Sequence, residues 1–274
     1  MRFLVAVILG LCAAVEAEGS EGNRRVYVSQ GWNILESDNF RFCSRGPLQL
    51  SDRVVRATER MRSNLARQWL GSQQREEGWR PKCDIVLHST ADAYLRAVPG
   101  GEQTVGCSLI NTEAGEVVGR RIDIRADRPG WLDAALAHEL THVVLADHFA
   151  DRCLPAWADE GMAVLADSDS KQGAHQRDLR TAHSRGSAFR LVELFALEGY
   201  PSPDRQAAFY GQSASLVRYL VARGSPHQFT RFMSTAAADG YDAAVRTIYG
   251  LQGIADLERR WLQDVSMAGA VAKN

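Results

Sequence analysis

Residues 138–142 read His-Glu-Leu-Thr-His and lie within a strongly apolar, helix-forming segment, residues 131–149. Four residues advance a helix by about one turn, so His138 and His142 must project from the same face and can share one metal ion. Glu139 lies one residue further round, where it can reach a metal-bound water without being a ligand. The motif therefore predicts a helix that binds a metal.

Neutral imidazoles suit Zn²⁺, and a catalytic zinc site has three protein ligands and one open position. His148 is one candidate for the third ligand, six residues after His142. Leu145 favours a continuing helix, on which six residues rotate a side chain by about 240°. Glu160 is the other candidate, near the start of a second apolar helix in which a buried carboxylate needs a partner. We expect one zinc ion per chain, held by His138, His142 and Glu160.

A second motif, Trp-x-x-Glu-Gly-x-Ala, occupies residues 157–163. Together the two motifs resemble the gluzincin zinc metallopeptidases, specifically the bacterial peptidase MA-like group. In that family the two motif histidines and the glutamate of the Glu-Gly pair bind zinc, and the first glutamate is the general base. The resemblance thus implies His138, His142 and Glu160 as ligands and Glu139 as the base.

The resemblance is sharp over residues 131–166 and extends to residues 204–223. Zinc aminopeptidases of this superfamily have a tyrosine in the latter segment that donates a hydrogen bond to the tetrahedral intermediate. Tyr210 matches it, and the resemblance implies a catalytic role for this residue. Asp159 stands where these aminopeptidases usually have Asn, so recognition of a free amino terminus is not implied.

The function that the resemblance implies is hydrolysis of peptide bonds by a metal-activated water with a glutamate base. Two alternatives stay open: a catalytically silent binding module on the zincin scaffold, and a zinc hydrolase of a non-peptide amide. Glu139 counts against the first, since zinc binding alone needs no base at that position.

The order of the predicted elements indicates an α+β fold, and the resemblance implies that it is of the zincin type. One or two strands within residues 26–43, a helix at 51–70 and strands at 83–87, 104–110 and 117–125 form an α/β half, residues 18–150, that ends in the motif helix. A helical half, residues 151–274, carries the third zinc ligand, with the active site between the halves. Its helices are expected at residues 155–166, 170–184, 189–197, 204–223, 226–238, 241–248 and 253–267. A strand within 104–125 is expected to pair with an extended substrate.

The N-terminus is typical of a signal peptide, residues 1–17. It has a positively charged start, a short apolar run and a cleavage site made of small residues. The apolar run is too short to span a bilayer, which takes about 20 residues. Export to the periplasm or the medium is therefore expected, with no membrane span after cleavage. Cys12 leaves with the signal, and an oxidising compartment then favours two disulfides among the remaining cysteines, Cys43, Cys83, Cys107 and Cys153.

The formal net charge of −1 argues against a nucleic-acid partner, which would require a basic excess. The expected partner is a peptide or protein substrate. The sequence carries no signal for a particular oligomeric state.

Overall fold

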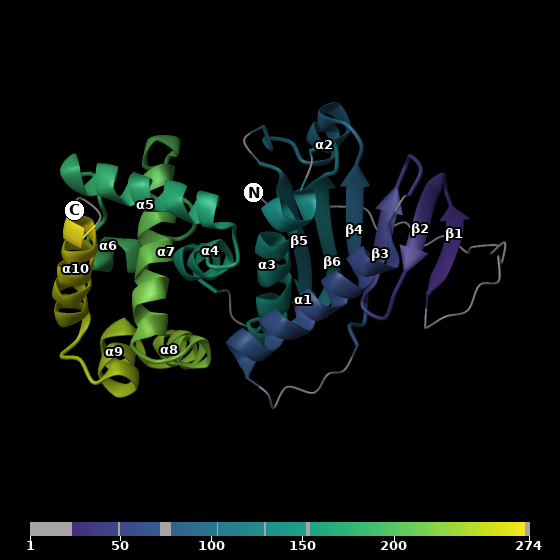
Figure 1. Ribbon diagram of the computed structural model, residues 1–274. Helices are drawn as coiled ribbons and strands as arrows, with labels where there is room; N and C mark the ends of the chain where they lie inside the picture. Colours follow the sequence, from purple (N-terminus) through teal and green to yellow (C-terminus); the bar gives the residue numbers. More distant parts are fainter. Residues whose placement is uncertain are drawn as a thin grey trace.

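The computed structural model describes residues 24–48, 50–71, 78–102, 104–128, 130–151 and 154–271. A mixed sheet lies on one side of the molecule and a group of helices on the other (Figure 1). All the described strands precede residue 126, and the described elements after it are helical. The predicted α+β class is confirmed. The predicted signal peptide lies outside the described residues.

The sheet has six strands in the order β1-β2-β3-β4-β6-β5. Strands β3, β4 and β6 run parallel to one another, whereas β1, β2 and β5 pair antiparallel with their neighbours. Strand β5 therefore forms one edge of the sheet, and one of its sides pairs with none of the described strands. The strands span β1 (Arg25–Ser29), β2 (Trp32–Glu36), β3 (Phe40–Ser44), β4 (Cys83–His88), β5 (Gly106–Glu113) and β6 (Glu116–Arg125).

One face of the sheet is apolar and buried. Its side chains alternate along the three parallel strands and include Phe40, Phe42, Ile85, Leu87, Ile122 and Ile124. Helices α1 (Asp52–Leu70) and α3 (Ala137–His148) lie across this face (Figure 1). The opposite face carries α2 (Ala91–Ala97), which the sequence pattern did not predict; Tyr94 of this helix packs edge-on against His88 of β4.

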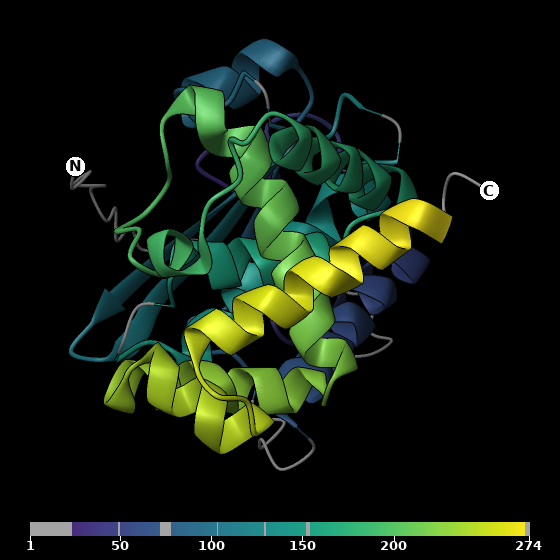
Figure 2. The same cartoon turned by 90° about the vertical axis from the view of Figure 1, so that its left-hand side faces the viewer.

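The helical half is built around α7 (Gln206–Ala222), which is buried along most of its length. Figure 2 shows α10 crossing over it on the outer side. The remaining helices are α4 (Ala156–Val164), α5 (Asp169–Ser184), α6 (Leu191–Phe195), η2 (Pro203–Arg205), α8 (Pro226–Asp239), α9 (Tyr241–Tyr249) and α10 (Ile254–Val271). Each helix that periodicity predicts after residue 150 is therefore present. No helix in the described ranges is both long and apolar enough to cross a membrane.

Helix α4 approaches α7 closely at Gly161. A Cβ atom at this position would lie 2.5 Å from Cγ2 of Val217 and 2.7 Å from the backbone oxygen of Ser213. Because real Cβ contacts are not this short, only glycine allows the two helices to pack at this distance. Gly161 follows Glu160 directly, so the same close contact fixes where α4 presents that carboxylate.

We predict that Gly161→Ala destabilises the protein by about 1–3 kcal/mol, since the added methyl group must push α4 and α7 apart. The measurement is the urea midpoint of unfolding. Gly173→Ala in α5 is the matched control: its new Cβ would meet only the end of the flexible Arg177 side chain, at 3.6 Å. The control should gain up to about 1 kcal/mol from reduced backbone entropy. Equal effects of the two substitutions would contradict the packing argument.

The prediction of two disulfides is wrong. Cys43, Cys83 and Cys107 are all free. Two bridges among four cysteines would have to join at least one pair of these three. The fourth, Cys153, lies outside the described residues.

The sheet explains why these cysteines do not pair. Cys43 and Cys107 lie in one cross-strand row, with Val86 and Asp123 on the two strands between them. Three strand spacings are about 14 Å, twice the Cα separation that a disulfide tolerates. Cys83 belongs to the apolar cluster on the opposite face of the sheet. Burial raises the pKa of Cys43 to about 12 and that of Cys107 to about 11, which keeps both thiols protonated.

Candidate metal centre

The two motif histidines lie one turn apart on α3, and their ring centroids are 5.0 Å from each other. A π-helical turn, η1 (Leu132–Leu136), directly precedes α3. Such turns are rare and are frequently found at functional sites. His142 is 8% exposed, while His138 is half-buried at the edge of a cavity. The helix thus presents both imidazoles on one face, as the spacing predicts.

Glu160 reaches the histidines from α4, which packs against α3. Its Oε2 atom lies 3.5 Å from Nε2 of His138. One ligand atom from each of His138, His142 and Glu160 lies within 4.8 Å of the others. Oε2 is buried and has no hydrogen-bond partner, which is costly for a carboxylate unless a cation faces it. Two imidazole nitrogens and a carboxylate oxygen are also a donor set that catalytic zinc takes, so the residues present fit that metal.

Two further carboxylates lie behind the histidines. Oδ2 of Asp167 lies 3.2 Å from Nδ1 of His138, and Oδ1 of Asp159 lies 2.9 Å from Nδ1 of His142. Asp167 also accepts a hydrogen bond from Lys171, at 2.8 Å. Carboxylates in these positions fix the ring orientation and direct the other ring nitrogen toward a metal. Sequence reasoning assigned neither residue to the site.

These contacts dominate the proton affinities of the site. Burial alone would lower the pKa of His138, but the hydrogen bond with Asp167 and the ion pair with Glu160 outweigh it and raise that pKa to about 9. Burial is likewise outweighed at His142, whose pKa the adjacent Asp159 raises to about 10. Burial would raise the pKa of Glu160, yet the two imidazoles hold it below its usual value. The cluster therefore stabilises a cation among the carboxylates.

Glu139 is 8% exposed and lies beneath the first residue of the edge strand β5, Gly106. A Cβ atom on Gly106 would lie 2.8 Å from Cγ and 2.9 Å from Oε1 of Glu139. The absence of a side chain at this point of β5 therefore leaves room for the motif glutamate. Both residues line the cavity that contains the histidines.

Two tyrosines line the same cavity. Tyr210, on α7, stacks at a tilt on His175 with ring centroids 5.8 Å apart, and burial raises the pKa of its hydroxyl. Tyr200 precedes η2 and donates a hydrogen bond to Oε1 of Glu160 at 2.5 Å. The sequence singled out Tyr210 and missed Tyr200. The only local signal for Tyr200 was an aromatic residue in the loop Gly199-Tyr200-Pro201.

His148 is exposed at the end of α3, where its ring packs against Phe149. It is not part of the group formed by His138, His142 and Glu160. Of the two candidates for the third ligand position, the structure thus brings Glu160 and not His148 to the motif histidines.

The cavity has a volume of about 620 Å³. It lies between the edge strand β5 on one side and helices α4, α5 and α7 on the other, where the sequence predicts the site. The residues that give it its chemistry are Gly106, Cys107, His138, Glu139, His142, Asp159, Glu160, Asp167, Lys171, His175, Tyr200 and Tyr210.

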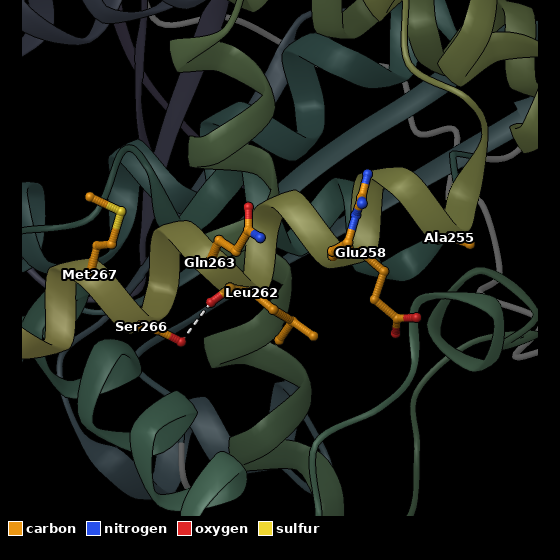
Figure 3. Close-up of a pocket in the computed structure, with 7 residues that line it drawn as sticks. Ala255, Glu258, Leu262, Gln263, Ser266 and Met267 are labelled. Carbon is orange, nitrogen blue, oxygen red and sulfur yellow. Dashed lines mark hydrogen bonds between the residues drawn. The ribbon is translucent and has the colours of Figure 1, made fainter.

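A second hollow, of about 640 Å³, runs along the outer face of α10 (Figure 3). It is lined by side chains of that single helix and contains no histidine or cysteine. Its acidic residue, Glu258, accepts a hydrogen bond from the backbone N–H of Leu191. This hollow offers no group of converging ligands, so the candidate centre is the cavity beside β5.

Comparison with known proteins identifies the family. The family described as the Peptidase MA superfamily matches residues 114–267, more than half of the chain and the whole of the candidate ligand set. No curated protein matches the chain. A crystal structure of an M1 zinc metallopeptidase mutant from Deinococcus radiodurans is 16% identical, with a TM-score of 0.43. The alignment covers 87% of this chain and 51% of that one, so the chain spans about half the length of that protein. The family match confirms the resemblance drawn from the two motifs: the chain belongs to the Peptidase MA superfamily.

Proposed function

We propose that the protein is a zinc-dependent peptidase of the gluzincin type, with His138, His142 and Glu160 as the metal ligands. The observation that carries the proposal is the convergence of these three residues, with Oε2 of Glu160 buried and without a hydrogen-bond partner and with Glu139 beside them. Zinc bound there would lower the pKa of a water molecule and polarise a carbonyl group.

The protein's own residues carry out the remaining steps. Glu139 accepts the proton of the attacking water and passes it to the leaving amine, which is the work of a general acid–base. Tyr210 donates a hydrogen bond to the oxygen of the scissile carbonyl as negative charge develops on it. The unpaired edge of β5 holds the substrate in an extended conformation through backbone hydrogen bonds. The substrate is thus a peptide segment that can lie along β5.

We also propose that the protein is exported, with cleavage of the signal peptide after Ala17. N-terminal sequencing of the protein recovered from outside the cytoplasm should then begin at residue 18. Recovery of the uncleaved chain from the cytoplasm alone would contradict export and leave the catalytic proposal intact.

The first prediction concerns Glu139→Gln. This variant should bind one Zn²⁺ per chain like the wild type, but its kcat on a peptide library should fall by about 10²–10⁴-fold, because the general base is lost. A chelator should abolish cleavage by the wild type. Asp239→Asn, at the exposed end of α8, is the matched control and should cleave normally.

Four outcomes of that experiment exclude the proposal. Persistent cleavage by Glu139→Gln would show that Glu139 is not the general base. Zinc binding without cleavage of any peptide would favour a binding module, and cleavage of a non-peptide amide alone would favour another zinc hydrolase. Cleavage that a chelator leaves unchanged would exclude the metal.

The second prediction concerns Gly106→Ala. Its methyl group would displace Glu139 from beneath β5. A displacement on the order of 1 Å costs about 100-fold in rate, so kcat/KM should fall by roughly 10–100-fold while zinc affinity is retained. Gly46→Ala is the control, since its Cβ would meet nothing closer than Oγ of Ser44 at 4.0 Å. Normal activity of Gly106→Ala would show that the close contact does not position the base.

A further inference from the structure

Tyr200 connects the cavity mouth to the buried ligand set. The residue is 56% exposed, yet its hydroxyl reaches the carboxylate of Glu160, which is only 5% exposed. It is contributed by the segment between α6 and η2, not by α3 or α4, which carry the candidate ligands. A long side chain that crosses from solvent to a buried carboxylate gives up rotamer freedom, so the contact must offset that entropy.

The hydrogen bond makes the two oxygens of Glu160 different. Oε1 accepts from Tyr200, while Oε2 has no hydrogen-bond partner and lies 3.5 Å from Nε2 of His138. A carboxylate can bind a metal through one oxygen or through both. A donor fixed on Oε1 orients the carboxylate group and leaves Oε2 facing the histidines.

Packing holds the Tyr200 ring in this orientation. Its centroid lies 5.9 Å from the ring of Phe209, in an edge-on arrangement, and 6.5 Å from that of Tyr210. The backbone on either side is also restricted. Gly199 has a φ of 134°, which favours glycine, and Pro201 has its φ fixed by the ring. The loop thus presents Tyr200 in a defined direction.

We infer that Tyr200 is a positioning residue that fixes Glu160 for metal binding through Oε2 alone. The inference rests on the proposed function, because it presupposes that Glu160 is a zinc ligand. Tyr200 has a different role from Tyr210: it acts on the metal ligand, whereas Tyr210 acts on the substrate. The expected result of losing this contact is a lower metal affinity, because mutating a side chain that hydrogen-bonds to a metal ligand lowers affinity or activity by about 10–100-fold.

The test compares Tyr200→Phe with Tyr210→Phe. Each substitution removes the hydroxyl group from one of two neighbouring tyrosine rings. Zn²⁺ affinity is measured by competition with a chromophoric chelator, without substrate. Tyr200→Phe should bind Zn²⁺ at least about 10-fold more weakly than the wild type, whereas Tyr210→Phe should bind it normally. The visible spectrum of the Co²⁺-loaded protein should change only in Tyr200→Phe, since coordination by a second oxygen alters the geometry of the metal. Equal melting temperatures of the two metal-free variants establish that folding is intact.

A double-mutant cycle with Glu160→Gln tests whether Tyr200 affects Zn²⁺ binding through Glu160. If Tyr200 acts through Glu160, Tyr200→Phe should weaken Zn²⁺ binding by less than about 2-fold in the Glu160→Gln background. An undiminished effect there, or unchanged Zn²⁺ affinity and Co²⁺ spectrum in Tyr200→Phe, overturns the inference but leaves the proposed function standing. If His138→Ala binds Zn²⁺ as tightly as the wild type does, the proposed function itself is overturned.

Discussion

The burial of carboxylates beside the two motif histidines is the constraint on which the rest of the site depends. Glu160 and Asp159 approach the imidazoles from α4, and Asp167 approaches them from the bend between α4 and α5. An isolated buried carboxylate would be strongly destabilising, so each must have a cation close to it. The same interaction raises the pKa values of both histidines and lowers that of Glu160. The raised pKa values favour protonated imidazoles, which balance this charge when no metal is bound. A divalent cation can replace two such protons without a change in net charge, which is why metal binding to such a site releases protons.

The fold satisfies this constraint through two close contacts made by glycines. Gly161 lets α4 pack against α7, and that packing sets the position of Glu160 relative to α3. Gly106 lets the edge strand lie directly over Glu139. One contact therefore sets the position of Glu160, the proposed third ligand, and the other that of Glu139, the proposed general base. In both cases the sequence feature that matters is a missing side chain, and its partner lies on a different secondary-structure element.

The parts of this site that local sequence determines were predicted, and those that depend on long-range packing were not. The spacing of His138 and His142 is a property of one helix, and the periodicity after residue 150 predicted the helices that follow. Asp167 joins the site only because the bend between α4 and α5 brings it to His138 of α3, and nothing in its own neighbourhood indicates that. The prediction of two disulfides was wrong for the same reason. The number of cysteines suggested pairing, but only strand order and side-chain alternation reveal that Cys43 and Cys107 lie too far apart.

The two tyrosines illustrate the limit most clearly. Tyr210 lies on a helix, at a fixed interval from other recognisable residues, and a family resemblance can assign it a role. Tyr200 lies in a loop, where no periodicity relates it to any other position. Its partner Glu160 is 40 residues away, and the contact forms because α4 and the segment before η2 meet at the same cavity. A helix such as α3 or α4 can specify which atoms bind a metal. The orientation of those atoms depends on groups behind them, and a loop is free to supply such a group because its path is not tied to the helical repeat.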